Sequence, residues 1–330
     1  MKNRNVLNRT EYSFLRKALQ GIPRSKSQLN KFNESDCEVL KIAKNLFFCT
    51  STDSLSEEVA INLYKHPETW GWISVMNSIS DFSTSGAKPI GLMLSTEWGQ
   101  SFSEKDKLKF YNGVKQALRV SKVPLLGGDS GVSSGTFINT TVFGMSHSPV
   151  LTRLGVQPDD LIILLGDYFG IGPSLGYDFL FKKNKNTLEK KFRPKPNCKI
   201  LQALKKYVHA SIDTSDGVIT SLEIISNLNK VSYELNLQKI SVCKAIASYV
   251  KKNKLSMNYL LSSDLGDLQT LIFVAPKDYS LIKNKLGFHQ ITGEVKNKNY
   301  KSTFDKTLFY ELIQPQPDYK KIHSDYIHSC

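Results

Sequence analysis

Residues Val208–Gly217 read VHASIDTSDG, a short apolar segment that ends in two carboxylates and a glycine. Asp213 and Asp216 are three residues apart, and this spacing places both on one face of the first turn of a helix. Acidic side chains there interact favourably with the helix dipole. Alone, the stretch is typical of an ordinary capped helix start. Its meaning therefore depends on whether similar acidic turns recur along the chain.

The composition is that of a globular protein that buries a sizeable core. The chain has 330 residues, of which 40% are hydrophobic and 22% charged, and this length favours two domains. No apolar run approaches the ~20 residues of a membrane span, and the amino terminus lacks the apolar core of a signal peptide. Five scattered cysteines indicate reduced thiols and no structural zinc site. We expect a cytoplasmic protein without a membrane partner.

The net charge of +14 raises the question of nucleic-acid binding. The lysines are spread widely, however, and no aromatic residues alternate with the densest run, at residues 182–191. Nucleic acid is therefore not expected as the main partner, whereas a polyanionic small ligand such as a nucleotide would be attracted. The basic loop 182–197 is predicted to be a surface connection.

The first half of the chain alternates predicted strands and helices. A basic amino-terminal segment with one short helical patch precedes a predicted hairpin, and Asp81 is expected to interrupt the helix that follows. A later strand is expected to end on glycines and Asp129, and Ser148-Pro149 marks a domain boundary. The expected hairpin strands are 34–42 and 45–53, the helices 70–82 and 104–120, and the other strands 90–95, 123–126 and 137–145.

The second half shows the same alternation, with strands at 161–165 and 270–274 and a helix at 199–207. Glycines follow the first of these strands at 166, 170, 172 and 176. Glycines in this position can hold a phosphate, but their spacing matches neither the Walker loop nor the dinucleotide fingerprint. A flexible turn into a helix is the other interpretation, and the sequence leaves both open.

Aspartates beside small or hydroxyl residues recur in five segments. Each one alone is typical of a cap or a turn, but together they predict a carboxylate cluster. Neighbouring carboxylates raise each other's pKa, so such a cluster needs a counter-charge. Mg²⁺ supplies it, typically through one or two carboxylates and substrate phosphate oxygens, and this arrangement suits phosphoryl transfer from a triphosphate. The aspartates are Asp36, Asp53, Asp81, Asp129 and the pair Asp213/Asp216.

Five motifs in order resemble the thiamine-monophosphate kinase family, which belongs to the superfamily of aminoimidazole ribonucleotide synthetase and selenophosphate synthetase. They are Thr50-Ser51-Thr52-Asp53, Asn77-Ser78-Ile79-Ser80-Asp81 with Gly86-Ala87-Lys88-Pro89, Gly127-Gly128-Asp129, Arg153-Leu154-Gly155-Val156-Gln157-Pro158-Asp159-Asp160 and Ile212-Asp213-Thr214-Ser215-Asp216-Gly217. Phe192-Arg193-Pro194-Lys195-Pro196 also looks like an Arg-Pro-x-Pro segment of that family.

The resemblance implies an ATP-dependent kinase of α/β (α+β) class with a two-domain, synthetase-related architecture. Residues 34–148 would form an ATP- and Mg²⁺-binding domain with a mixed sheet and helices, which also dimerises. Residues 149–330 would form an α/β sandwich domain that closes the active-site cleft, and residues 1–33 the basic segment. The implied partners are ATP, a small and phosphorylated acceptor, and a second copy of the chain.

The resemblance also assigns roles to residues. Several Mg²⁺ ions would be held by Asp36, Ser51, Thr52, Asp53, Asp81, Asp129, Asp213 and Asp216. ATP would be contacted by Gly128, Asp129, Arg153 and Ser215. The catalytic residues would be Asp53, Asp129 and Asp216.

The chain departs from the family pattern mainly where the acceptor would bind. Glu34-Ser35-Asp36-Cys37 has lost one of two adjacent carboxylates, and Asp129 is followed by Ser130-Gly131-Val132. The segment that would meet thiamine phosphate is Val59-Ala60-Ile61, and residues 262–268 are less similar to the family. Three alternatives follow: a kinase of the family, an ATP-dependent paralogue with another acceptor (including ligase-like activation of an amide or carboxyl oxygen), and a non-catalytic nucleotide-binding paralogue. The retained aspartates argue against the last.

Overall fold

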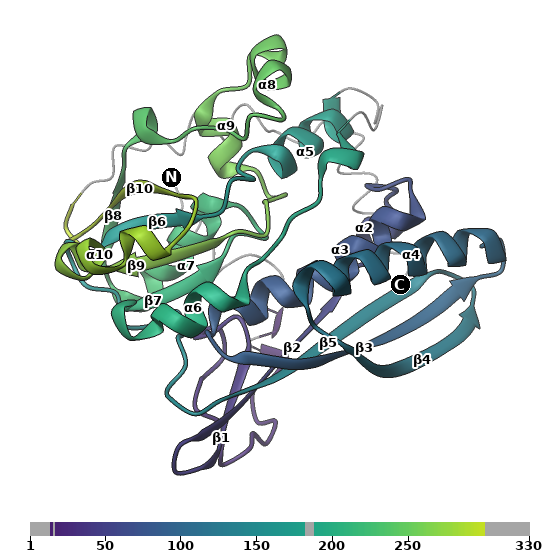
Figure 1. Ribbon diagram of the computed structural model, residues 1–330, viewed down its shortest axis with the longest axis horizontal. Helices are drawn as coiled ribbons and strands as arrows, with labels where there is room; N and C mark the ends of the chain where they lie inside the picture. Colours follow the sequence, from purple (N-terminus) through teal and green to yellow (C-terminus); the bar gives the residue numbers. More distant parts are fainter. Residues whose placement is uncertain (1–13, 16, 182–187, 301–330) are drawn as a thin grey trace.

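The computed structural model describes residues 14–15, 17–181 and 188–300 (Figure 1). The predicted helical patch in the basic segment lies partly outside these ranges, as does the lysine-rich part of the loop 182–197. Within the described ranges, no helix is both long enough and apolar enough to span a membrane. Two five-stranded sheets, each built from one half of the chain, form the core of the fold. The expectation of a two-domain α/β architecture is confirmed.

The first sheet is mixed, with the order β1-β2-β5-β3-β4. The predicted hairpin is confirmed, since β1 pairs with β2 in antiparallel fashion. Among the described residues, the only parallel pair of strands in this sheet is β3 with β4. The basic segment extends the hairpin, because Lys41 N donates to Ser27 O and Leu29 N to Val39 O. The strands are β1 Glu38–Ala43, β2 Leu46–Ser54, β3 Lys88–Gly99, β4 Leu125–Ser133 and β5 Phe137–Ser146.

Two long helices, α3 (Pro67–Thr84) and α4 (Glu104–Ser121), cover one face of this sheet, while α2 (Ser56–Ala60) follows β2. The two long helices cross closely, because a Cβ atom at Gly71 would lie 2.0 Å from Phe110 O. The prediction that Asp81 interrupts its helix is wrong, since α3 continues to Thr84. Buried Ser83 and Thr84 donate their hydroxyls to carbonyls three residues earlier, and these bonds suit a helix end.

Gly127, Gly128 and Asp129 lie inside β4, so the prediction that the strand ends on them is wrong. The strand continues because it pairs in parallel with β3 through Ser133. Glycine at 128 permits that close pairing, since a Cβ atom there would lie 1.7 Å from Leu94 O.

The second sheet has the order β7-β9-β6-β10-β8 and its recorded pairs are all antiparallel. Side chains of β6 alternate between two cores: Ile162 and Leu164 pack with α7 and α9, and Ile163 and Leu165 with α6 and α10. The strands are β6 Leu161–Leu165, β7 Ala210–Asp213, β8 Ser232–Leu235, β9 Thr270–Val274 and β10 His289–Lys296. The helices are α5 Ile171–Phe181, α6 Cys198–Leu204, α7 Val218–Asn229, α8 Ala247–Asn253, α9 Met257–Ser262 and α10 Pro276–Ile282.

The stretch 208–217 is a strand, a turn and a glycine before a helix, so the prediction that both aspartates lie in a first helical turn is wrong. Strand β7 ends on Asp213, and α7 begins only after Gly217. Gly217 has a φ of 83°, which favours glycine. A Cβ atom there would also lie 2.1 Å from Ser263 O. The two carboxylates therefore lie at opposite ends of a tight turn.

The described part of the basic loop, residues 188–197, is not a surface connection as predicted. Leu188 and Phe192 are buried in the same core as α3, and Glu189 is fully buried. The lysines between them remain exposed. Buried Leu188, Glu189, Phe192 and Pro194 thus flank two exposed lysines, and the lysine content of the loop gave no sign of these buried positions.

Candidate active site

Helix α3 connects the two halves of the molecule through its last turn. Ser80 Oγ donates to Asp213 Oδ2 at 2.9 Å, and Ser211 Oγ donates to the carbonyl of Thr84 at 2.6 Å. Both contacts join α3 to strand β7 of the second sheet. As a result Asp81, on the same helical turn as Ser80, lies beside Asp213.

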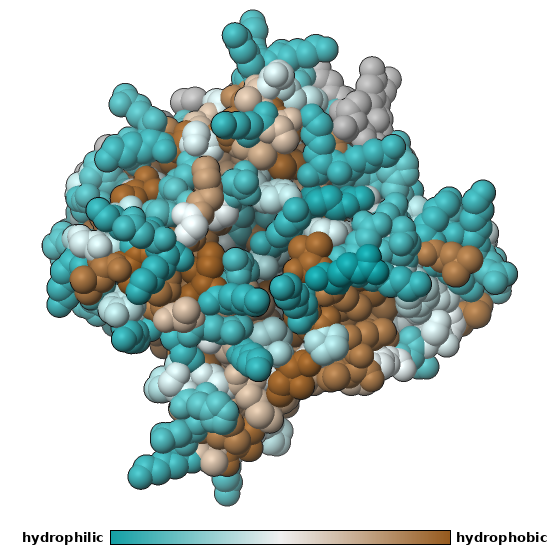
Figure 2. Space-filling view, viewed as in Figure 1, coloured by the Kyte–Doolittle hydropathy of each residue, from teal (hydrophilic) through white to brown (hydrophobic). Residues whose placement is uncertain are grey.

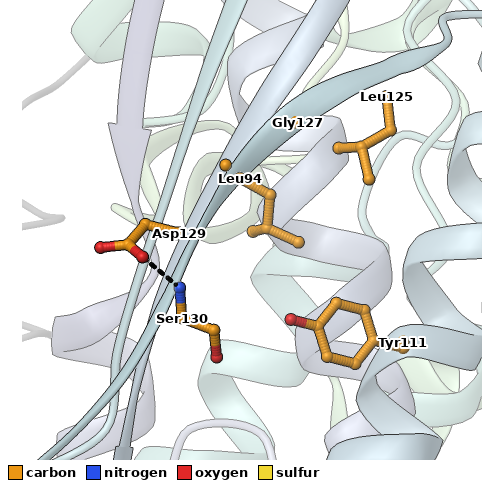
Figure 3. A pocket seen from close by; sticks show the side chains of 7 residues that line it. Leu94, Tyr111, Leu125, Gly127, Asp129 and Ser130 are labelled. Carbon is orange, nitrogen blue, oxygen red and sulfur yellow. Dashed lines mark hydrogen bonds between the residues drawn. The ribbon is translucent and has the colours of Figure 1, made fainter.

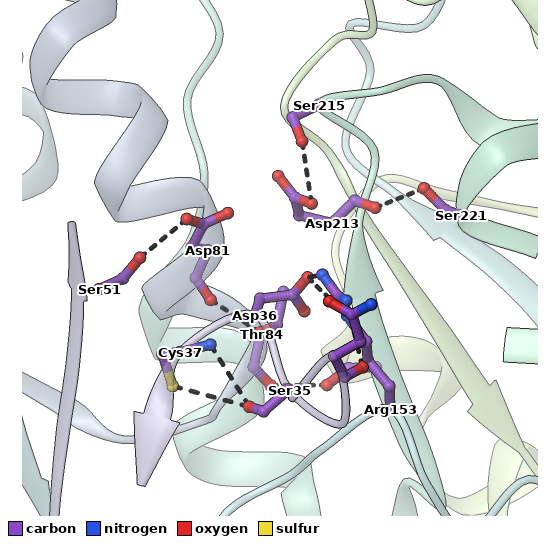
Figure 4. Close-up of polar contacts among 12 residues, drawn as sticks. Ser35, Asp36, Cys37, Ser51, Asp81, Thr84, Arg153, Asp213, Ser215 and Ser221 are labelled. Atoms are coloured by element: carbon purple, nitrogen blue, oxygen red, sulfur yellow. Dashed lines mark hydrogen bonds and ion pairs between the residues drawn. The ribbon is translucent and has the colours of Figure 1, made fainter. Parts of the chain in front are cut away.

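Asp36, Asp81 and Asp213 form a carboxylate cluster in which each offers one oxygen within 4.8 Å of the others (Figure 4). Asp36 comes from the loop before β1, Asp81 from α3 and Asp213 from the end of β7. Two hydroxyls orient the group: Ser51 Oγ donates to Asp81 Oδ2 at 2.8 Å, and Ser215 Oγ to Asp213 Oδ1 at 3.2 Å. Five residues predicted for the site are thereby brought together.

Burial and repulsion between carboxylates raise the pKa values of Asp213 and Asp81 in the cluster and of Asp53 nearby. Burial, with the charge of Asp36 next in size, raises the pKa of Asp213 to about 8. Burial and the charge of Asp213 hold the pKa of Asp81 well above its usual value. Burial raises the pKa of Asp53 to about 6, and Asp216 adds to that effect. The raised pKa values show that the positive charge near the cluster does not balance its carboxylates.

Arg153 supplies the positive charge that does reach the cluster. Its Nε and Nη2 atoms donate to Asp36 Oδ1 at 3.0 and 2.5 Å, and Nη1 donates to the carbonyl of Asn33 at 3.2 Å. The other oxygen of Asp36, Oδ2, is buried and has no hydrogen-bond partner. A buried carboxylate oxygen without a partner is costly, and a hard cation is a ligand that satisfies it. The donor set of this cluster therefore fits Mg²⁺.

Two other predicted site residues, Thr52 and Asp129, lie apart from the carboxylate cluster in the structure. Thr52 Oγ1 contacts Thr141 Oγ1 at 3.0 Å on the exposed face of the first sheet. Asp129 lies on β4, which is three strand spacings, or about 14 Å, from β2 and Asp53. Figure 3 shows the Asp129 side chain pointing away from Tyr111, on the other side of the strand. One chain thus does not bring Asp129 to the carboxylate cluster.

A hollow of about 250 Å³ lies beside β4, on the side of the sheet that carries α4 (Figure 3). It contains Gly128, which was predicted to contact ATP. Its lining residues are Leu94, Tyr111, Leu125, Gly127, Gly128, Asp129 and Ser130.

Sequence reasoning missed three polar residues near the site. Ser80 anchors Asp213, as described above. Glu58 lies near Asp53, and burial raises its pKa to about 7. Asp267 is buried and accepts hydrogen bonds from Gly170 N and Gly172 N, both at 2.6 Å. These amides are therefore already bonded to a carboxylate of the chain. Of the two interpretations of the glycines after β6, this favours a turn into a helix over a phosphate-binding loop.

Two sheets, one mixed and one antiparallel, with a carboxylate cluster between them are the architecture expected of the aminoimidazole ribonucleotide synthetase class. Accordingly, the family described as "AIR synthase related protein, N-terminal domain" matches residues 34–146. A thiamine-monophosphate kinase of Buchnera aphidicola subsp. Acyrthosiphon pisum is 31% identical over 253 residues, which cover 73% of this chain and 76% of the relative. The chain belongs to the thiamine-monophosphate kinase family.

Solved structures share the fold. A structure described as AaThiL complexed with AMPPCP and TMP has a TM-score of 0.72 at 21% identity, covering 86% of this chain and 89% of the other. The thiamine monophosphate kinase of Aquifex aeolicus has a TM-score of 0.70 at 19% identity, covering 88% and 95%. At these identities the likeness concerns the architecture.

We expect the metal-free protein to lose stability progressively as the pH rises from about 3.8, the ordinary pKa of Asp213, to about 8, its pKa in the folded protein. The folded-state pKa of Asp213, about 8, exceeds its ordinary value of 3.8, so the folded protein keeps a proton that the unfolded chain releases. The contribution of the Asp213 proton to the free energy of unfolding is complete below the ordinary pKa of the carboxyl group. It is lost by the pH at which Asp213 ionises in the folded protein. Thermal unfolding in EDTA measures the slope, and Mg²⁺ should reduce it. A flat profile without metal would contradict the burial of charge in this cluster.

Proposed function

We propose that the protein transfers the γ-phosphoryl group of ATP to the phosphate of thiamine monophosphate, giving thiamine diphosphate and ADP. The carboxylate cluster of Asp36, Asp81 and Asp213 is the observation that carries this proposal, because a triphosphate-consuming site needs such a group. Family membership and the relatives named for this activity support the choice of acceptor.

Asp36, Asp81 and Asp213 would hold Mg²⁺, with Asp53, Asp216 and the hydroxyl of Ser51 nearby. When bound, the ion would neutralise phosphate charge as the γ-phosphoryl group moves. The residues themselves act by position: Ser51, Ser80 and Ser215 fix the carboxylate orientations through the bonds described above. No covalent intermediate with the protein is required.

The nucleotide would be bound by residues on both sides of the cluster. Arg153 lies against Asp36, and its planar guanidinium is suited to pair with two phosphate oxygens. Ser215 lies in the turn after β7, within hydrogen-bond distance of Asp213. Gly128 and Asp129 of β4 would contact ATP and a further Mg²⁺ ion from the second copy of the chain, in the assembly proposed next, because one chain does not bring Asp129 to its own cluster.

We also propose that two copies of the chain assemble through the open face and edge of the first sheet. Strand β4 is an edge strand, and apolar side chains are exposed on and beside it: Met93 44%, Leu126 54%, Val132 71% and Phe137 41%. Figure 2 shows apolar residues gathered over β3–β5. Such a patch marks an interaction surface. A second copy there would place another chain next to Asp129, which lies apart from the cluster of its own chain.

The dimer is tested by replacing Leu126 with glutamate and measuring mass by sedimentation. Wild type should sediment as a dimer and the variant as a monomer with reduced turnover. Replacing the exposed Leu281 of α10 (64% exposed) with glutamate is the matched control. A monomeric wild-type protein with full activity would contradict the assembly.

We further propose that the domains are residues 34–148 and 149–330, and that the enzyme is cytoplasmic. The gap between β5 and β6 contains the proposed boundary. A cytoplasmic location accords with ATP as substrate and with the free thiols of Cys37, Cys49, Cys198 and Cys243.

The acceptor is tested by following ADP release with Mg²⁺-ATP and a panel of thiamine monophosphate, thiamine and no acceptor. ADP release should depend on thiamine monophosphate. The residues that depart from the family, Ala60, Ile61 and 262–268, make this panel informative. ATP binding without acceptor-dependent ADP release would show that the acceptor is another compound, and absence of ATP binding would exclude a kinase.

A further inference from the structure

The segment 188–194, called the brace here, encloses the start of helix α3. Glu189 is fully buried. Its Oε2 accepts a hydrogen bond from Lys65 N at 3.0 Å, and its Oε1 accepts one from His66 N at 2.8 Å. His66 is the N-cap of α3 and makes no side-chain cap hydrogen bond. A residue 123 positions later in the chain therefore adds a second carboxylate, beside Glu68 of the first turn, at the helix end where the dipole favours negative charge.

Other contacts of the brace extend along the first two turns of α3. Trp72 Nε1 donates to the carbonyl of Pro194 at 3.1 Å, and Arg193 Nη1 donates to Thr69 Oγ1 at 3.2 Å. The Arg193 guanidinium lies 5.9 Å from the centre of a Trp72 ring. Phe192 stacks on Tyr64, with ring centres 6.1 Å apart. The brace is thus fitted to α3 by polar and aromatic contacts together.

The other end of the same helix carries Asp81. Pro67 and Asp81 are 14 residues apart, so the brace acts about 21 Å from the carboxylate cluster. Helix α3 is buried along most of its length and transmits position as a rigid element. Its last turn is tied to β7 through Ser80 and Asp213. The place of Asp81 relative to Asp213 therefore depends on how both ends of α3 are held.

We propose that Glu189 is a positioning residue for the metal cluster, because it fixes the start of α3 and with it the location of Asp81 relative to Asp36 and Asp213. The catalytic consequence rests on the proposed function. The predicted effect on cation binding does not depend on the proposed function, because the carboxylate cluster is a feature of the fold itself.

The test is Glu189→Gln in the full chain, with Mn²⁺ as the probe ion. Glutamine keeps the size but leaves one oxygen for two amide donors. We expect the Mn²⁺ dissociation constant, measured by electron paramagnetic resonance without nucleotide, to rise about tenfold, the lower range for residues that orient metal ligands. The Mg²⁺ concentration for half-maximal turnover should rise similarly, and excess Mg²⁺ should restore kcat.

Thr292→Val is the control for a merely structural loss. Thr292 is fully buried, and its Oγ1 donates to the carbonyl of Ile162 at 3.1 Å within the second sheet. We expect it to lower the unfolding temperature while leaving Mn²⁺ affinity unchanged. If Glu189→Gln lowers that temperature but changes Mn²⁺ affinity less than twofold, the proposal is overturned.

Arg193→Lys keeps the charge but loses the guanidinium geometry over Trp72, and it provides the test if Glu189→Gln does not fold. It should weaken Mn²⁺ binding in the same direction by a smaller factor, and unchanged affinity would overturn the proposal. Wild-type protein that binds Mn²⁺ but forms no thiamine diphosphate would refute the proposed function while leaving this test intact.

Discussion

Replacing Asp213 with asparagine is expected to abolish phosphoryl transfer and to stabilise the metal-free protein at the same time. The variant loses a carboxylate of the cluster, and removing one preorganised electrostatic contact at a reacting centre typically costs at least about 100-fold in kcat. Stability should change in the opposite direction, because the raised pKa of Asp213 shows that its charged form is disfavoured in the fold. Asparagine has nearly the same shape and keeps an oxygen that can accept from Ser80.

Two measurements check this result: kcat at saturating Mg²⁺ and ATP, and thermal unfolding in EDTA at pH about 8.5. Asp167→Asn is the matched control, because Asp167 is an exposed carboxylate on the turn after β6. In this control variant, kcat and the unfolding temperature should stay at the wild-type level. An Asp213→Asn protein that is less stable than wild type at this pH would contradict the inference that the charged form of Asp213 destabilises the metal-free fold.

The second large effect is expected from Gly266→Ala, in the segment 262–268, which is less similar to the family pattern. A Cβ atom at Gly266 would lie 1.6 Å from Thr214 O and 2.7 Å from Ser215 O. The contact is reciprocal, since Gly266 N donates to Ser215 O at 2.8 Å. The loop around Gly266 therefore presses on the turn between Asp213 and Asp216. An added methyl group must displace backbone on one side or the other.

We expect Gly266→Ala to lower the free energy of unfolding by about 3 kcal/mol, the upper range for overpacking. Turnover should fall by about 100-fold, because a displacement near 1 Å at a reacting group has that effect. Denaturant unfolding and steady-state kinetics measure the two quantities. Gly176→Ala is the control, since a Cβ atom there would meet Leu265 Cβ at an ordinary 3.5 Å. Equal behaviour of the two variants would show that the 214–217 turn tolerates movement.

Local patterns predicted most elements of the fold and several members of the site. Hydrophobic periodicity identified α3, α4, β6 and β9, because each buries one face or a continuous apolar run against a neighbour. Recurrent acidic turns predicted one cluster of Asp36, Asp53, Asp81, Asp129, Asp213 and Asp216, and the structure places Asp36, Asp81 and Asp213 within reach of one another.

The remaining errors arose where a distant segment decides the local structure. Asp213 ends a strand rather than beginning a helix because β7 pairs with β9, nearly 60 residues later in the chain. Glu189 is buried because it meets the start of α3, and no pattern within a lysine-rich loop reveals that partner. Asp129 joins the motifs in sequence, but strand order places it on the far side of the first sheet. Spacing in the chain carries no information on that order.

The most direct test of the proposed activity is phosphorus NMR of wild-type protein incubated with Mg²⁺, ATP and thiamine monophosphate. The account predicts that the thiamine monophosphate signal is replaced by the two coupled signals of a diphosphate ester, while ATP is converted to ADP in equal amount. Asp213→Asn, under the same conditions, should leave both substrates unchanged. If ATP is consumed and the thiamine monophosphate signal persists, or if Asp213→Asn forms product as fast as wild type, the account is contradicted.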